Sequence, residues 1–316
     1  MESKNNWKAW LYLAPVIILM AVFTFYPIID TFFISFLDGY DYTLGTYSGF
    51  TFNNYIRLLT PYGGNNYYFN QFMKVGLPNT LLLTFITVPI SIILSLMIAI
   101  GLNSIKVFKK AFQTIFFMPY VTNAIAIGMV FAVIFDTQYG IFNAIFGIQG
   151  FPWIYPNPAA EAGQGMVNYW SAFFAICFYI VWHSLPYKIL IFLGGLQNID
   201  QQYYDAAKID GSNKLKTSLK ITVPLLSPQI LYIMITSFIG AFKEYNSVVG
   251  MFGTTGGQFN GNTGPESMQT VVFFIYERMK KPTQVQYACS AAVILFIIIM
   301  IFTAIQFKVS KKRVHY

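Results

Sequence analysis

Six long apolar runs dominate the chain, and each is long enough to cross a membrane as a helix. They cover residues 10–29, 77–102, 115–135, 170–194, 230–252 and 287–307. About 20 apolar residues in a helix span the ~30 Å hydrocarbon core of a bilayer. Only 10% of the 316 residues are charged, whereas soluble domains contain about 25%. The sequence therefore predicts an all-α membrane protein with six transmembrane helices.

Basic residues predict which side of the membrane each loop occupies, because cytoplasmic loops carry an excess of lysine and arginine. The segments 37–78, 136–168 and 253–286 are poor in such residues and are expected outside, with Arg57, Lys74, Arg278, Lys280 and Lys281. The inner segments contain Lys4, Lys8, Lys106, Lys109, Lys110, Lys208, Lys214, Lys216, Lys220, Lys308, Lys311, Lys312 and Arg313. Both termini are therefore expected in the cytoplasm of a cell-membrane protein. The net charge of +8 then reflects topology rather than nucleic-acid binding.

The first run could instead be the apolar part of a signal peptide. It ends in Phe25-Tyr26-Pro27, whereas a signal peptide ends in a small-residue cleavage site. We expect it to be retained as the first span.

Enzyme motifs are absent from the sequence. There is no G-x-x-x-x-G-K-[ST] phosphate loop, G-x-S-x-G, H-E-x-x-H or Cys-x-x-Cys. His183 and His315 are the only histidines, and Cys177 and Cys289 lie inside apolar runs, where a thiol packs as a small hydrophobic group. We expect no catalytic site, metal or cofactor in this chain. A polytopic membrane enzyme would need a catalytic constellation, and a scaffold without a transport role would not need polar groups inside its spans.

A charged interval, residues 201–228, separates the fourth and fifth runs and is expected to form two short cytoplasmic helices. Residues that cap or break helices set the expected bounds: Asp200 caps the first helix, Asp210-Gly211 ends it, Ser212 or Asn213 caps the second, and Pro224 ends that one. Ala206-Ala207 gives the first helix a bare face that another protein could approach closely.

The same spacing resembles the EAA loop of permease subunits in binding-protein-dependent ABC importers. The matching residues are Asp205, Ala206, Ala207, Asp210, Gly211 and Pro224. Asp205 stands where the family usually has Glu, and Val223 where Leu is common. The resemblance implies that residues 197–228 form a coupling loop that docks on an ATPase subunit. The alternative is an ordinary amphipathic loop helix that contains Asp-Ala-Ala.

Polar residues inside the fourth run are candidates for a solute site, because polar groups at membrane depth usually face a cavity or a partner. His183 and Tyr187 are four residues apart and share a helix face, and Ser184 lies beside them. The fragment from Trp182 to Tyr187 resembles the stretch that lines the sugar site of maltose-type permeases, matching at its Trp, Pro and Tyr. The alternative is a structural His-Ser pair that bonds backbone groups freed by Pro186.

A second polar cluster lies in the fifth run. Ser237, Gly240 and Glu244 are spaced at i, i+3 and i+7 and so lie on one helix face. Lys243 points about 100° away from Glu244, and it could contact substrate or pair with a carboxylate on another helix.

Two further features border these clusters. Tyr120 and Asn123 in the third run are a candidate third wall of the site. Lys188, nearer the inner end of the fourth run, is expected to extend its side chain to the membrane surface.

The resemblance implies the type I ABC importer permease fold, with residues 1–316 as one transmembrane domain. It implies a sugar substrate, most simply an oligosaccharide, moved by alternating access. An importer of glycerol phosphate or of an acidic, uronate-type oligosaccharide is the alternative, in which Lys188 and Lys243 would be charge partners. The implied partners are a second, homologous permease, two ABC ATPase subunits that bind ATP and Mg, and an extracytoplasmic solute-binding protein.

Overall fold

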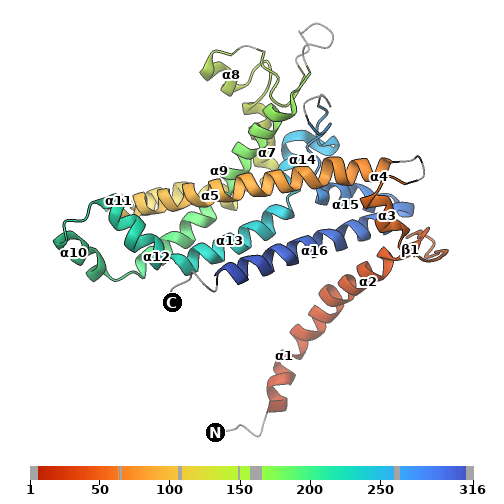
Figure 1. Ribbon diagram of the computed structural model, residues 1–316, viewed down its shortest axis with the longest axis horizontal. Helices are drawn as coiled ribbons and strands as arrows, with labels where there is room; N and C mark the ends of the chain where they lie inside the picture. Colours follow the sequence, from red (N-terminus) through yellow and green to blue (C-terminus); the bar gives the residue numbers. More distant parts are fainter. Residues whose placement is uncertain are drawn as a thin grey trace. The chain divides into compact units, whose positions relative to one another are not determined.

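The computed structural model describes residues 6–62, 64, 66–105, 109–148, 150–156, 166–259 and 264–310. Lys4, Lys106, Lys311, Lys312, Arg313 and His315 lie outside the described residues. The chain divides into two compact units, one formed by residues 1–72 and 274–297 and the other by residues 73–273 and 298–316. Figure 1 shows that helices make up most of both.

Among the described residues, four helices are long and apolar enough to cross a membrane: Trp10–Ser35, Tyr67–Ser104, Tyr169–Gln197 and Pro282–Ser310. Two further helix pairs pass the same test together but are sharply bent. Thr114–Val121 and Ala124–Ile134 meet at 105°, and Lys214–Leu225 and Ser227–Phe242 meet at 69°. Counting each pair as one span gives six, the number that the sequence predicts. The first bend lies inside the expected third span, whereas the second lies between Leu225 and Ser227, before the expected fifth span begins.

The first unit begins with an almost continuous helix and a small hairpin. Its elements are α1 (Asn6–Met20), the π-helical η1 (Ala21–Phe25), α2 (Tyr26–Ser35), β1 (Leu37–Asp38), β2 (Gly49–Phe50), α3 (Asn53–Leu59), α4 (Tyr67–Phe69) and η5 (Pro282–Gln284). The strands β1 and β2 pair antiparallel. The buried Asn54 amide donates to the carbonyls of Ser35 (3.0 Å) and Leu37 (2.8 Å), which anchors α3 to the end of α2.

Three helices contain residues of both units: η2 (Asn70–Gly76), α15 (Val271–Met279) and α16 (Val285–Ser310). The amphipathic segment around residues 271–279 is therefore the helix α15. Within the first unit, Arg57 Nη1 donates to the Tyr287 hydroxyl of α16 at 2.6 Å, and the Tyr68 ring stacks on Tyr287 with a centroid distance of 4.1 Å.

The second unit contains the remaining helices. They are α5 (Leu77–Ser104), α6 (Lys109–Val121), α7 (Ala124–Ile134), α8 (Ile141–Phe146), α9 (Tyr169–Gln197), α10 (Gln201–Ile209), α11 (Lys214–Thr217), η3 (Ser218–Thr222), α12 (Val223–Leu225), α13 (Ser227–Phe242), α14 (Asn246–Phe252) and η4 (Gly253–Thr255). The helix α9 packs along α5, and α13 packs on both.

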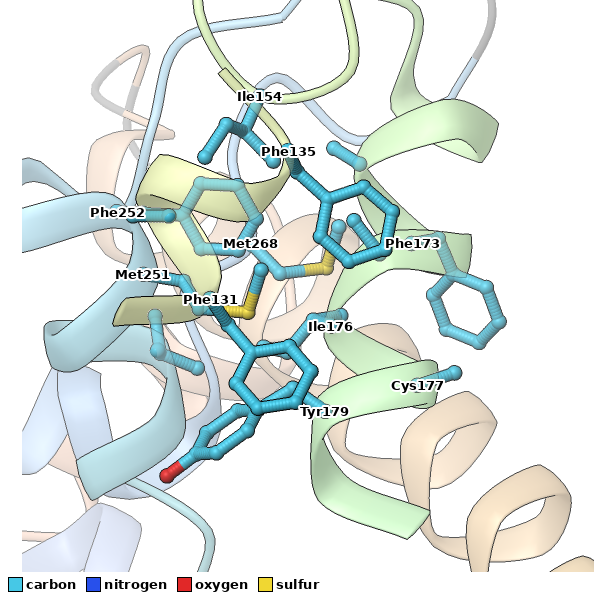
Figure 2. Close-up of a cluster of buried hydrophobic side chains, with 14 of the residues drawn as sticks. Phe131, Phe135, Ile154, Phe173, Ile176, Cys177, Tyr179, Met251, Phe252 and Met268 are labelled. Carbon is cyan, nitrogen blue, oxygen red and sulfur yellow. The ribbon is translucent and has the colours of Figure 1, made fainter. Parts of the chain in front are cut away.

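An aromatic core joins α7, α9 and α14, as Figure 2 shows. Phe131 lies in α7 and Phe135 is its C-cap residue. Both side chains point toward Phe173 and Tyr179 of α9, and Met251 of α14 lies among them. The Tyr179 hydroxyl donates to the carbonyl of Ala124 at 2.5 Å, so the one polar atom of this ring is satisfied. Cys177 belongs to this core and is a free thiol, as expected, and Cys289 is likewise free and buried.

Asn123 produces the bend in the third span. Its side-chain oxygen accepts the backbone N–H groups of Ile125 (2.9 Å) and Ala126 (3.3 Å) and so caps α7. A capping asparagine adopts extended rather than helical backbone angles, here φ −60° and ψ 125°. The straight helix predicted over residues 115–135 is therefore two helices.

The fifth span is interrupted at residues 243–245, where the sequence predicts an unbroken helix over 230–252. The N–H groups of Lys243 and Glu244 bond to the carbonyls of Gly240 and Ala241, three residues back, which closes α13. Glu244 Oε1 then accepts the N–H of Ser247 at 3.0 Å in the first turn of α14. The polar pair Lys243-Glu244 thus marks a helix boundary.

Candidate functional site

A cavity of about 290 Å³ lies among α5, α6, α9 and α13 in the second unit. Its wall contains hydroxyl groups, an imidazole, an ammonium and a carboxylate. The lining residues are Thr87, Val88, Ser91, Tyr120, Ile180, His183, Ser184, Tyr187, Lys188, Thr236, Ser237, Gly240, Ala241 and Glu244. The polar face predicted on the fourth span and that on the fifth therefore meet at one cavity.

Most of the substrate-site residues expected from the sequence line this cavity, namely Tyr120, His183, Ser184, Tyr187, Ser237, Gly240 and Glu244. Asn123 and Lys243 do not belong to the lining. Asn123 uses its side-chain oxygen to cap α7. Lys243 is the exposed C-terminal cap of α13, so its side chain leaves the helix face that Ser237 and Gly240 share.

Two tyrosines form a stacked pair at the cavity. The rings of Tyr120 and Tyr187 have centroids 5.6 Å apart and an interplanar angle of 17°. The Tyr187 hydroxyl also lies 3.0 Å from that of Tyr232 on α13. Tyr187 thus connects α9 to both neighbouring walls, and its ring remains half-exposed beside the cavity.

His183 and Ser184 differ in whether their side-chain polar atoms have hydrogen-bond partners. Ser184 Oγ donates to the carbonyl of Val181 at 2.9 Å. His183 Nε2 is buried and has no hydrogen-bond partner among the described residues. The alternative in which both bond backbone freed by Pro186 does not match this geometry, because the carbonyl freed by a proline is that of residue i−4, here Trp182.

Trp182 lies on another surface. Its ring packs on Phe131 at 5.2 Å and lines a separate, almost wholly apolar groove of about 520 Å³ with Phe174 and Phe178. The tryptophan of the fragment that resembles maltose-type permeases is therefore no part of this cavity.

Lys188 is buried at the cavity rather than extended to the membrane surface, so the sequence-based expectation is wrong. Only 5% of the residue is exposed. Its ammonium donates to Ser91 Oγ at 2.5 Å and to Ser184 Oγ at 3.1 Å. These hydroxyls, on α5 and α9, give the charge local partners within the protein.

Sequence reasoning missed the wall formed by α5. Thr84, Thr87, Ser91 and Ser95 are buried and follow one another at helical spacing, and Thr87 and Ser91 line the cavity. That stripe of hydroxyl residues in an apolar run was the signal that could have found it. Thr236, beside the predicted Ser237, was also missed.

The charged interval 201–228 forms α10 and α11 with the expected caps. The Asp200 side chain accepts the N–H of Gln202 at 3.0 Å, and that of Asn213 accepts the N–H of Lys216 at 2.8 Å. Gly211 lies between them with φ +66°. The N–H of Gly211 bonds to the carbonyl of Lys208 and that of Ser212 to Ala207, which is a Schellman motif.

Pro224 does not end the second helix, contrary to expectation. Helical turns continue from α11 through η3 and α12 to Leu225, and the bend of 69° comes after it. Pro224 lies where the π-helical η3 passes into α12, so its missing N–H falls at a change in the hydrogen-bond pattern rather than inside a regular α-helix.

The surface of α10 is largely polar and exposed. Asp205 accepts a hydrogen bond from the Lys208 ammonium at 2.9 Å, and this contact lowers the pKa of the Asp205 carboxyl. Ala206 is exposed, but Ala207 is buried. Only one of the two alanines is therefore accessible to an approaching partner.

Comparison with known proteins agrees with this architecture. Residues 91–316 match the family described as the binding-protein-dependent transport system inner membrane component. The chain is 30% identical over 303 residues to AraP of Bacillus subtilis (strain 168), the arabinooligosaccharides transport system permease protein, covering 95% of this chain and 88% of AraP. It is also 30% identical over 310 residues to LacF of Rhizobium radiobacter, the lactose transport system permease protein, covering 97% of this chain and 95% of LacF.

The fold resembles a solved structure as well. A chain in the bacterial alginate ABC transporter, in complex with its alginate pentasaccharide-bound periplasmic protein, superposes with a TM-score of 0.75 and 15% identity, covering 98% of this chain and 96% of that one. The type I importer permease fold expected from the sequence is thereby confirmed. The chain therefore belongs to the family of multi-pass inner membrane components of binding-protein-dependent transport systems.

Proposed function

We propose that this chain is one of two permease subunits of an ATP-driven importer of an oligosaccharide, and that it works by alternating access. The observation that carries the proposal is the polar cavity among α5, α6, α9 and α13, where the stacked Tyr120 and Tyr187 lie beside hydroxyl groups. AraP and LacF, which this chain resembles along almost its whole length, are named for sugar transport.

The chemistry of the cavity suits a sugar. An aromatic ring offers an apolar face for the C–H groups of a pyranose, and hydroxyl and imidazole groups offer donors and acceptors for its hydroxyls. Tyr187 supplies the ring, and His183 supplies a buried nitrogen that has no partner among the described residues. A bound sugar hydroxyl would satisfy that nitrogen.

The chain is expected to work with other subunits. The sequence lacks a phosphate-binding loop, so ATP and Mg would bind to two separate ATPase chains. Two features support a role of residues 197–228 as the docking loop. The helix α10 is exposed, with Asp205 and Ala206 on its surface, and the turn that follows it is ordered by Gly211 and Asn213. Four expected spans precede that loop and two follow it, so a cytoplasmic docking loop implies that both termini are cytoplasmic as well.

A second permease and a solute-binding protein complete the proposed assembly. A second, homologous permease would complete the solute path, and residues 1–316 would act as a single transmembrane domain within it. The family itself is defined by dependence on a binding protein, which would deliver the solute to the outer side.

Purification from the native membrane followed by a transport assay tests this function. The tagged chain should copurify with a second permease and an ATPase, and proteoliposomes containing the complex and its binding protein should accumulate an oligosaccharide only with ATP. Recovery of the chain alone, or ATP-independent accumulation, would contradict the proposal.

A further inference from the structure

The second cationic side chain expected at the substrate site, Lys243, lies outside the cavity lining, but Lys188 lies within it. Lys188 is almost wholly buried by the protein, since only 5% of it is exposed. Placing an ammonium at membrane depth is costly unless it serves a path or a partner. The charge therefore requires an explanation.

The hydroxyl partners of Lys188 do not neutralise its charge. Ser91 Oγ donates its own proton to the carbonyl of Val88 at 2.9 Å, and Ser184 Oγ donates to Val181 at 2.9 Å. Each oxygen accepts from Lys188 with a lone pair. An ammonium has three N–H donors, and two of them are used, so one remains for a group in the cavity.

One oxygen of the carboxylate that lines the cavity is held by a backbone donor. Glu244 Oε1 accepts the backbone N–H of Ser247. Within the ranges that the structure describes, no ion pair joins Glu244 to Lys188. The cavity therefore presents a negative group that already has a backbone donor and a positive group that has only neutral acceptors.

Resting on the proposed function, we propose that Lys188 is a specificity-determining residue that binds an anionic group of the transported carbohydrate, a uronate carboxylate or a sugar phosphate. The substrate anion takes the third N–H of the ammonium and supplies the charge that Ser91 and Ser184 lack. Tyr187, which stacks on Tyr120, contacts the same sugar through its ring. Burial makes such a charge-assisted hydrogen bond stronger than its counterpart in water.

Lys188→Met and Lys188→Arg variants test this assignment in the complete transporter with its own binding protein. Three probes are compared: a galacturonate trisaccharide, a neutral galactose trisaccharide and galactose 6-phosphate. Since a hydrogen bond to a charged group contributes about 1.5–3 kcal/mol, Lys188→Met should lower the uptake of the anionic probe, relative to the neutral one, by at least about tenfold. Lys188→Arg should retain part of the preference for the anionic over the neutral probe.

Lys243→Met is the matched control, because it removes an exposed lysine outside the cavity and should leave the ratio unchanged. The binding protein is the same in every arm, so a change in the ratio comes from the permease. As a second measurement, each anionic probe should raise the melting temperature of the purified complex without binding protein, and Lys188→Met should abolish that rise. The preferred probe then distinguishes carboxylate from phosphate.

Equal losses of anionic and neutral uptake in Lys188→Met, or no loss of either, would overturn the specificity role. Neither outcome would refute the proposed function of the wild-type chain as a sugar importer. The specificity role would also be refuted if the wild-type complex is stabilised only by the neutral trisaccharide. Failure of every carbohydrate to be transported would instead refute the proposed function, and this inference with it.

Discussion

Gly128 of α7 and Gly250 of α14 meet backbone to backbone. A Cβ atom added to Gly128 would lie 2.8 Å from the Gly250 Cα, and one added to Gly250 would lie 2.9 Å from the carbonyl oxygen of Ile125. The two helices therefore cross at the distance of their main chains, as small residues allow between membrane helices.

Gly128→Ala should destabilise the protein, because the obstructing atoms belong to backbone and cannot rotate away. Overpacking of this kind costs about 1–3 kcal/mol. The melting temperature of the detergent-purified chain should fall. Gly101→Ala is the control, since a Cβ there meets nothing within 4 Å and alanine is the better helix former. Equal melting temperatures for the two variants would show that α7 and α14 do not cross so closely.

Gly211→Val should uncouple transport from ATP hydrolysis. A β-branched residue resists a φ of +66°, so the Schellman turn between α10 and α11 should be lost while the spans still insert. Sugar uptake and the stimulation of ATPase activity by loaded binding protein should both fall, with normal amounts of chain in the membrane.

Gly147→Val provides a control with equal backbone strain. Gly147 has φ +65° and open space around it, as Gly211 has, but it caps α8 in the segment expected outside. It should leave coupling intact. Uncoupling by both variants, or by neither, would argue against a specific docking role of α10 and α11.

The helix ends of the coupling loop could be predicted from sequence because local chemistry decides them. Asp200, Gly211 and Asn213 act through hydrogen bonds and backbone angles within a few residues. The helix end at Pro224 was predicted less well, because the turns before it are those of the π-helical η3. The sequence does not signal this change in the hydrogen-bond pattern, and the helical turns continue to Leu225.

The site was only partly predictable, because helical spacing gives a face but not its neighbour. The faces of His183 with Tyr187 and of Ser237 with Gly240 were correct, and they line one cavity. Nothing in the spacing of Lys188 reveals Ser91, which lies 97 residues away in sequence. Likewise, the presence of Asn123 in an apolar run does not reveal whether its side chain faces a solute or caps a helix.

Cysteine labelling tests the topology. Ile209 and Tyr139 are almost equally exposed, at 87% and 86%, and they lie in segments expected on opposite sides. A cysteine at Ile209 should react with a membrane-impermeant maleimide only in inverted vesicles, and one at Tyr139 only in intact cells. The buried native thiols Cys177 and Cys289 should give little background. Reaction of both positions from the same side would refute the six-span arrangement.

Tyr187 should matter more to transport than Ser237, although both line the cavity. Tyr187→Ala removes a ring that stacks on Tyr120 and buries much more area than a hydroxyl, so uptake at low substrate concentration should fall by about tenfold or more. Ser237→Ala removes one hydroxyl, whose neutral hydrogen bond to the sugar would contribute a net ~1 kcal/mol, and should lower uptake by about fivefold at most.

Tyr187→Phe separates the ring from its hydroxyl, which lies 3.0 Å from that of Tyr232. If the ring supports the sugar, Phe should transport nearly as well as the wild type, and all three variants should assemble in equal amounts. Should Tyr187→Phe be as impaired as Tyr187→Ala, the contact with Tyr232 rather than stacking is what transport requires. If Tyr187→Ala transports normally in an intact complex, the sugar does not stack on α9. The aromatic platform must then be sought in the second permease, since the two halves of a heterodimer need not share the substrate contacts equally.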